Sequence, residues 1–320
     1  MILVFIDQAD GHIKKASFEA ASYAAKIAEQ TGTTAEAIVL GTVSDDLASL
    51  GNFGVKKVHT VADASLNHFD AQVYTKIIAQ TADATGADTI VFSNTTTGKA
   101  VAPRLSVRLK AGLVSGAVAL PDTSNGFVVK KSVFSGKAFA MIAVNTAKKI
   151  IALNPNSFNL SSGGAAAEVV PFAATIDAAK IEVTAVNKVT GDVPLSEADI
   201  VVSGGRGLKG PENWGLVTDL AKLLGAATAC SRPVADIHWR PHHEHVGQTG
   251  LAIAPNLYIA IGISGAIQHL AGVNRSKTIV VINKDPEAPF FKAADYGIVG
   301  DAFEVVPKII EAVKKIKAGA

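Results

Sequence analysis

The chain has 320 residues, of which 48% are hydrophobic and 18% charged, so it can form a substantial core and is long enough for two domains. Lysine and arginine number 30 and aspartate and glutamate 28, which leaves no large positive field for a nucleic acid partner. Its apolar runs are far shorter than the roughly 20 residues of a membrane-spanning helix, and no signal peptide is recognisable. We therefore expect a globular cytoplasmic protein that is not a membrane protein. The single cysteine, Cys230, excludes an internal disulfide.

In the first half, short runs rich in valine and isoleucine alternate with alanine-rich stretches of helical spacing. The predicted strands are Ile2–Ile6, Ala37–Leu40, Lys57–Val61 and Thr89–Phe92, and the predicted helices are Lys14–Gln30, Ala71–Ala84 and Ala100–Leu109. This alternation predicts a parallel sheet with helices on both faces. Two later runs, Phe127–Val133 and Ala138–Val144, predict an antiparallel hairpin that extends the sheet.

The end of the first half changes in composition. Residues 154–167 are rich in Asn, Ser, Gly and Ala, which predicts a surface loop. Glu182–Val186 is expected to be the last strand, and Asn187–Ala198, with Gly191 and Pro194, has the composition of a linker. We place the boundary near residue 190, which gives an N-terminal domain of residues 1–190 and a C-terminal domain of residues 191–320.

The alternation resumes in the second half. The predicted strands are Ile200–Ser203, Ala227–Cys230, Leu257–Ile261, Thr278–Ile282 and Gly297–Val299, and the predicted helices are Glu212–Leu224, Ala266–Ala271 and Glu304–Ile316. The expected fold class is α/β, with two domains that each contain a mainly parallel sheet and flanking helices.

Glycine and polar residues directly follow several strands of the second half. These clusters are Gly204–Gly207, Ser231–Pro233, Gly262–His269, Asn283 and Asp301, and Val246–Gly250 adds further hydrogen-bonding groups. In open parallel sheets, ligands bind at the carboxyl ends of the strands, where the strand order reverses. The clusters together predict a cofactor site. In it, Gly262 and Gly265 let phosphates come close, and Ser264 caps a helix whose N-terminus faces an anion.

Three motifs near this edge leave alternatives open. Residues 205–210 have the form Gly-x-Gly-x-x-Gly, but no acidic residue follows about 20 positions later, so we favour a loop in which Arg206 pairs with a phosphate. Arg232, followed by Pro233, either supplies a fixed charge to the site or forms a surface salt bridge. The loop of His238, His242, His243 and His245 contains Pro241, which prevents the helix that would align its first histidines, so we expect a polar surface loop and no metal site.

The second half closely resembles the alpha subunit of electron transfer flavoprotein. The shared segments are Gly205–Leu208, Ser231–Pro233, Val246–Gly250, Leu257–Gly272, Ile282–Asn283 and Asp295–Asp301. The first half resembles the family through its α/β pattern and the motif Gly98-Lys-x-x-x-Pro-Arg104, whereas the histidine-rich loop departs from the family pattern. The resemblance implies FAD as the cofactor and a C-terminal domain with a Rossmann-like FAD-binding fold of the flavodoxin-like or DHS-like type.

The resemblance also implies the residues of the cofactor site. The FAD-binding positions carried over from the family are Arg206, Ser231, Arg232, Val246, Gly247, Gln248, Thr249, Ser264, Gly265, Ala266, Ile267, Gln268, His269, Asn283, Asp301 and Ala302. Among them, three side chains would tune the flavin: Arg232 as a fixed positive charge, Thr249 as a hydroxyl at ring N5, and His269 as a donor to the pyrimidine carbonyl. No catalytic residue is expected, because the family carries electrons.

The function implied by the resemblance is that of an electron carrier rather than an enzyme. The family works as a heterodimer with a beta subunit, which would contact the N-terminal domain and cover the flavin. Single electrons would pass from acyl-CoA dehydrogenases of fatty acid beta-oxidation, and from other flavoprotein dehydrogenases, to a membrane quinone oxidoreductase. The alternative within the family is a subunit of an electron-bifurcating complex that uses NADH.

Two other classes of function remain possible from the residues alone. An FAD or NAD oxidoreductase needs an acid or base committed to its substrate, and apart from His269 none is evident. A nucleotide-binding regulatory module would retain the phosphate-binding loops but would have no use for Arg232 and His269 at a redox-active ring.

Overall fold

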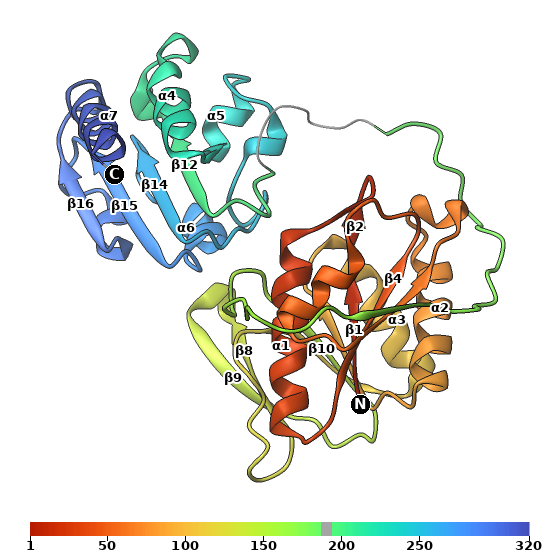
Figure 1. The fold of residues 1–320 in the computed structure, drawn as a ribbon. Helices are drawn as coiled ribbons and strands as arrows, with labels where there is room; N and C mark the ends of the chain where they lie inside the picture. Colours follow the sequence, from red (N-terminus) through yellow and green to blue (C-terminus); the bar gives the residue numbers. More distant parts are fainter. Residues whose placement is uncertain (187–193, 320) are drawn as a thin grey trace. The chain divides into compact units, whose positions relative to one another are not determined.

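The computed structural model describes residues 1–186 and 194–319. The chain divides into two compact units, Met1–Asn187 (unit 1) and Lys188–Ala320 (unit 2), and each unit is an α/β layered structure (Figure 1). Within the described ranges, every helix is too short or too polar to span a bilayer.

Unit 1 is built on a sheet that contains nine strands among the described residues. Their order is β11 (Glu168–Pro171), β5 (Lys57–Val61), β4 (Ala35–Leu40), β1 (Ile2–Ile6), β6 (Thr89–Ser93), β10 (Lys149–Leu153), β7 (Gly112–Ala117), β8 (Val128–Val133) and β9 (Ala138–Ala143). The strands from β11 to β7 run parallel, and β8 and β9 form the predicted antiparallel hairpin at one edge. A small separate hairpin joins β2 (Gln8–Ala9) to β3 (His12–Ile13).

Helices cover both faces of this sheet, as the alternation predicts. The helices are α1 (Lys15–Gln30), α2 (Ala71–Ala84) and α3 (Thr96–Leu109), with the short 3-10 helices η1 (Leu47–Phe53), η2 (Ala64–Asn67) and η3 (Phe134–Gly136). Successive residues of β1 point to opposite faces, so Val4 packs in one core with Tyr23 of α1, and Phe5 packs in the other with Ile77 of α2. The result is a central parallel sheet that is buried on both sides.

The structure corrects the expected end of unit 1. The segment Glu182–Val186 is exposed and forms no strand, so that prediction is wrong. The sheet edge beside β5 is occupied by β11, which lies earlier in the chain. Of the predicted linker, residues 187–193 lie outside the described residues, while Leu195 and Ala198 are buried in the core of unit 2 and belong to it.

Unit 2 contains a five-stranded, fully parallel sheet within the described residues. The strand order is β13 (Ala227–Cys230), β12 (Ile200–Gly204), β14 (Leu257–Ile261), β15 (Thr278–Asn283) and β16 (Tyr296–Val299). The helices are α4 (Gly215–Leu224), α5 (Arg232–Asp236), α6 (Ile267–Val273) and α7 (Ala302–Ala318), and the 3-10 helices are η4 (Arg206–Leu208), η5 (Pro211–Asn213), η6 (His242–Glu244) and η7 (Pro289–Ala293). This order is that of a flavodoxin-like sheet, which confirms the expected fold class.

The strand order determines where a ligand can enter unit 2. From β12 the chain passes to β13 on one side and then to β14 on the other, so the order reverses between β12 and β14. At their carboxyl ends, the Gly205 amide donates to the Ile261 carbonyl at 2.9 Å and the Gly262 amide donates to the Ile282 carbonyl at 2.9 Å. The loops after β12, β14 and β15 therefore leave the sheet together at the reversal point.

Candidate functional site

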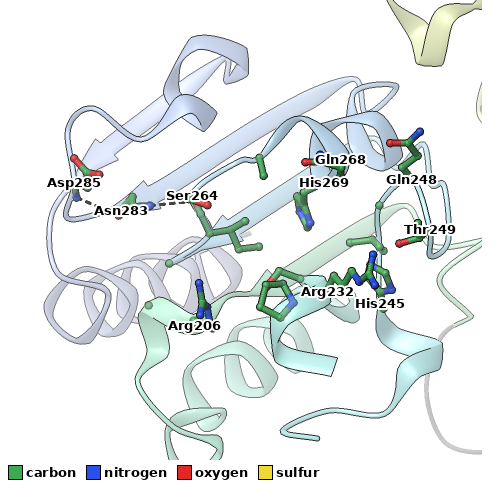
Figure 2. Close-up of a pocket in the computed structure, with 18 residues that line it drawn as sticks. Arg206, Arg232, His245, Gln248, Thr249, Ser264, Gln268, His269, Asn283 and Asp285 are labelled. Atoms are coloured by element: carbon green, nitrogen blue, oxygen red, sulfur yellow. Dashed lines mark hydrogen bonds between the residues drawn. The ribbon is translucent and has the colours of Figure 1, made fainter. Parts of the chain in front are cut away.

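A cavity of about 490 Å³ lies at this reversal point. Most of the predicted site residues line it: Arg206, Ser231, Arg232, Val246, Gly247, Gln248, Thr249, Ser264, Ala266, Gln268, His269 and Asn283. Figure 2 shows an elongated arrangement, with Ser264 and Asn283 toward one end, Gln248 and Thr249 toward the other, and His269 between them. The volume falls within the roughly 300–1,000 Å³ of small-molecule sites. The predicted residues therefore come together at one cavity of unit 2.

Glycines allow the strand-end loops to touch each other. The Gly207 amide donates to the Gly262 carbonyl at 3.0 Å, and a methyl group at Gly207 would lie 2.7 Å from the Gly262 Cα. Gly262 has a φ of +62°, and Gly265 has a φ of +82° with the Phe290 Cβ 2.4 Å from the position of its missing Cβ. Both glycines thus allow close contacts within the protein, and Gly262 also lines the cavity, so the close approach of phosphates to them stays a prediction.

Ser264 does not cap the helix that follows it. Helix α6 begins at Ile267 with Ala266 as its N-cap, and no side chain caps it. Gly265, with its left-handed backbone, turns the chain between Ser264 and the helix start, so the prediction of a serine cap is wrong. Ser264 is exposed and lines the cavity, so its hydroxyl is a hydrogen-bonding group of the cavity wall instead.

Asn283 and Asp285 form the wall at one end of the cavity. The Asn283 side chain donates to the Ile263 carbonyl at 3.0 Å and accepts from the Asp285 amide at 3.1 Å (Figure 2). It therefore ties the loop after β14 to the end of β15. Asn283 was predicted from the sequence as the first residue after the predicted strand that ends at Ile282. Asp285, which lines the same end of the cavity, was not predicted because it lies two residues further on.

Two arginines contribute positive charge to the cavity wall. Arg206 is exposed on η4 and forms no ion pair with a carboxylate in the part of the chain that the structure describes. Arg232 begins α5, with 62% of its side chain exposed, and its Nε lies 3.3 Å from the Asp236 carboxylate. Both interpretations of Arg232 thus apply, because it lines the cavity and also forms a surface pair. Such an exposed pair contributes only about 0–1 kcal/mol to stability.

The loop Val246–Gly250 is held against α6 by its backbone. The Gln248 amide donates to the Gln268 carbonyl at 2.7 Å. Gly272 of α6 packs so closely that a methyl group there would lie 2.4 Å from the Gly247 Cα. The side chains of Gln248 and Thr249 are exposed and line the cavity. The backbone of the loop is therefore held in place, and the Gln248 and Thr249 side chains extend from it into the cavity wall.

His269 is the buried polar group of the site. Its side chain is 7% exposed, and its Nε2 lies 2.8 Å from the hydroxyl of Tyr258, which is fully buried. Its Nδ1 is buried without a hydrogen-bond partner of normal geometry among the described residues. Burial, together with the positive potential of His245, lowers the pKa of His269 to about 4, and the opposing effect of the Val246 carbonyl is smaller. His269 is therefore neutral at neutral pH.

The histidine-rich loop is only partly a polar surface loop. His242 and His243 are exposed as expected, but His245 is 8% exposed and lines the cavity. Burial lowers the pKa of His245. The place of His245 in the cavity wall could not be predicted from the sequence, because it depends on a contact between distant residues. The amide of the next residue, Val246, donates to the Cys230 carbonyl at 3.1 Å. No group of three or more potential metal ligands gathers within the described residues.

Four of the residues carried over from the family lie outside the cavity wall: Gly265, Ile267, Asp301 and Ala302. Asp301 caps α7 by accepting from the Phe303 amide at 3.0 Å, and Ala302 is buried as the first residue of that helix. Ile267 begins α6 and is 60% exposed. Their contact with a cofactor stays a prediction. The cavity wall also includes six residues that are not among the FAD-binding positions carried over from the family: Gly207, Pro233, His245, Gly262, Ile263 and Asp285.

Comparison with known proteins places both units in one family. Residues 2–188 match the electron transfer flavoprotein domain, and residues 194–274 match the electron transfer flavoprotein FAD-binding domain. The chain is 37% identical over 319 residues to the electron transfer flavoprotein subunit alpha of Bacillus subtilis, with 98% of each chain covered. It is 37% identical to the proteins of the same name from Syntrophomonas wolfei, with 98% of each chain covered, and Mycobacterium tuberculosis, with 99% of each chain covered. The chain therefore belongs to the electron transfer flavoprotein family of electron carriers, as a relative of its alpha subunits.

Proposed function

We propose that this chain is the FAD-binding alpha subunit of a heterodimeric electron transfer flavoprotein. In this proposal it takes single electrons from acyl-CoA dehydrogenases and related flavoprotein dehydrogenases and passes them to a membrane quinone oxidoreductase. The match of unit 2 to a FAD-binding domain family supports FAD as the cofactor. The names of the relatives, which are alpha subunits, support a second subunit as the partner.

The observation that carries the proposal is the distribution of polar groups along the cavity. Arg206, without a carboxylate partner in the described residues, lies toward the end that Ser264 and Asn283 also line (Figure 2). An arginine without a partner suits a pyrophosphate. Arg232 and the neutral His269 line the rest of the cavity, where a ring that gains negative charge on reduction needs positive charge and donors. The residues present therefore fit a flavin dinucleotide.

FAD, when bound, supplies the one-electron chemistry that no side chain of the site can provide. The protein contributes binding and electrostatics. Arg206 offsets phosphate charge, and Asp285 accepts hydrogen bonds from hydroxyl groups. Arg232 provides a fixed positive charge, and the Thr249 hydroxyl can donate or accept a hydrogen bond. Because His269 is neutral and buried, it offers a donor without adding a charge that changes with pH.

The proposal is tested with the chain co-expressed with its second subunit. The purified complex is expected to contain FAD, identified by its absorbance spectrum, and to be reduced in two one-electron steps in an anaerobic titration. An acyl-CoA dehydrogenase with its substrate should reduce the complex. A complex without flavin would contradict the proposal. Direct reduction by NADH without a dehydrogenase would contradict the carrier role and favour the electron-bifurcating alternative.

A pair of variants tests the cavity itself. Arg206→Gln is expected to weaken FAD binding about tenfold, because one charge-assisted hydrogen bond contributes about 1.5 kcal/mol. Lys222→Gln is the matched control, since Lys222 is an exposed cation of α4 that does not line the cavity. Equal losses of affinity in both variants, measured by fluorescence titration of released FAD, would show that Arg206 has no specific role.

A further inference from the structure

Tyr258 is a hydrogen-bond partner of the buried His269, and the FAD-site residues carried over from the family do not include it. It lies on β14, at the centre of the unit 2 sheet, and is fully buried. Its hydroxyl is 2.8 Å from the His269 Nε2, and the rings of both residues pack against Phe290 with centroid distances of 6.2 and 5.7 Å. The two side chains therefore form one fixed pair behind the cavity wall.

Chemistry determines which partner donates in this pair. Burial raises the pKa of the Tyr258 hydroxyl and lowers that of His269 to about 4, so both groups are neutral at neutral pH. A phenol is a stronger acid than a neutral imidazole N–H, so the hydroxyl donates and Nε2 accepts. Ser203 on β12 supports this direction. Its hydroxyl is buried without a hydrogen bond of normal geometry, yet it is close enough to lower the pKa of Tyr258, as a donor to the phenol oxygen does.

The hydrogen bond from Tyr258 determines which ring nitrogen of His269 carries the proton. A neutral imidazole carries one proton, and if Nε2 accepts from Tyr258 that proton is on Nδ1. Nδ1 is buried without a partner of normal geometry among the described residues, since the Val246 carbonyl acts on the ring only weakly, and an unsatisfied buried donor is destabilising. Figure 2 shows the His269 ring directed from α6 toward the middle of the cavity. A ligand with an acceptor atom would relieve this cost.

We propose that Tyr258 is a positioning residue of the site: its hydroxyl holds His269 in the tautomer with the proton on Nδ1, which makes Nδ1 the donor offered to a bound ligand. The inference rests on the proposed function for the identity of that ligand, a carbonyl oxygen of the flavin ring. The arrangement is the second-layer contact by which proteins fix the tautomer of a functional histidine.

The direct test observes the tautomer. In the full complex labelled with ¹⁵N-histidine, long-range ¹H–¹⁵N correlation spectra distinguish a protonated from an unprotonated ring nitrogen, and His269→Gln identifies the signal among the eight histidines of the chain. We expect the proton on Nδ1 in the wild type and a shift of the population toward the Nε2 proton in Tyr258→Phe. The opposite tautomer in the wild type, or an unchanged one in Tyr258→Phe, would overturn the proposal.

A matched control variant separates the proposed effect of Tyr258 on the orientation of His269 from the general effect of losing a buried hydroxyl group. Tyr23 in unit 1 is also fully buried, and its hydroxyl donates to the Ala119 carbonyl at 2.8 Å, so Tyr23→Phe removes one comparable hydrogen bond far along the chain from the site. Tyr258→Phe is expected to weaken FAD binding about fivefold, and Tyr23→Phe to leave it within twofold. Equal effects of the two variants on FAD affinity would assign Tyr258 a structural role only.

The tautomer spectrum also keeps the two proposals distinguishable. It is recorded on the protein with or without FAD and does not depend on electron transfer. If the complex lacks flavin but His269 still responds to Tyr258→Phe, the proposed function fails while the positioning role of Tyr258 stands. If flavin is bound and reduced as expected but the tautomer does not respond, the positioning role alone fails.

Discussion

The two units have parallel sheets of the same kind, but the polar groups at their carboxyl edges differ. In unit 1 the strand order reverses between β1 and β6. There the Asp7 carboxylate lies 2.8 Å from the Lys14 ammonium and 3.3 Å from the Thr95 hydroxyl, and Asn94 donates to Asn154 at 2.8 Å. These groups satisfy one another. In unit 2, by contrast, Arg206 forms no ion pair and the His269 Nδ1 has no hydrogen bond of normal geometry among the described residues, although the Val246 carbonyl acts weakly on the ring.

This difference between the two carboxyl edges shows that the fold of a sheet does not by itself determine whether a ligand binds there. Both sheets offer a reversal point, where ligands of open parallel sheets bind. Among the described residues, the reversal point of unit 2 combines a cavity with a cation and a buried ring nitrogen that lack protein partners of normal geometry. A satisfied edge stabilises its own unit, whereas an unsatisfied edge keeps its hydrogen-bonding capacity for a ligand.

The largest expected effect comes from breaking the satisfied edge of unit 1. Lys14→Met leaves the Asp7 carboxylate, 8% exposed, without its cation, and should lower the free energy of unfolding by about 3 kcal/mol. Urea unfolding followed by circular dichroism measures this loss. The control Lys26→Met removes an exposed pair with Glu29 and should cost less than about 0.5 kcal/mol. FAD content should not change in either variant, and its loss in Lys14→Met would show that this edge also serves binding.

The second effect concerns the neutral histidine of unit 2. The pKa of His269 is about 4 in the folded protein against 6.5 for the free side chain, so the unfolded chain binds more protons between these values. The contribution of the His269 titration to the free energy of unfolding is therefore constant above pH 6.5. The free energy of unfolding falls as the pH drops from 6.5 toward 4. Between pH 7.5 and pH 5 this titration should lower the free energy of unfolding by about 2 kcal/mol.

This loss is measured as the difference between the wild type and His269→Gln. Both tryptophans of the chain, Trp214 and Trp239, lie in unit 2, so their fluorescence during urea unfolding reports on that unit. The same pH dependence in both proteins would mean that His269 is not buried in its neutral form, and the contrast between the two edges would lose its main support.

The smallest expected effect comes from the charge pair between Arg232 and Asp236 at the cavity wall of unit 2. Asp236→Asn frees Arg232 from its carboxylate partner and should strengthen FAD binding about twofold, with less than about 0.5 kcal/mol of change in stability. The gain should shrink as salt is added, because both side chains are more than half exposed. Asp219→Asn, on an exposed position of α4, is the control for the change in net charge. A gain of the same size in this control would mean that the Arg232 pair is not involved.

Much of the fold was predictable because strands and helices follow local patterns. Every predicted strand of unit 2 lies within one residue of an observed strand. The failures occurred where partners lie far apart in sequence. The segment Glu182–Val186 has a strand-like pattern but is exposed and unpaired, whereas β11 pairs with β5. The strands β7 and β10 were not singled out, because their neighbours in the sheet are distant in the chain.

The candidate site was predictable in position more than in detail. Polar residues after strands indicated the edge correctly, and most of them line the cavity. The predicted helix cap by Ser264 was wrong, because the start of α6 depends on the turn at Gly265. His245 and Asp285 were missed because burial and loop contacts bring them to the wall.

The sequence by itself determined the two mainly parallel sheets, their helical layers and the edge at which the cavity of unit 2 lies. These features depend on the alternation of apolar and polar residues, which is local. Only the tertiary structure decided that the His269 imidazole is neutral, that the Tyr258 hydroxyl contacts its Nε2, and that its Nδ1 has no hydrogen bond of normal geometry among the described residues. Those properties arise from burial and from contacts between residues of different elements, because both pKa and hydrogen bonding depend on what folding places around a group.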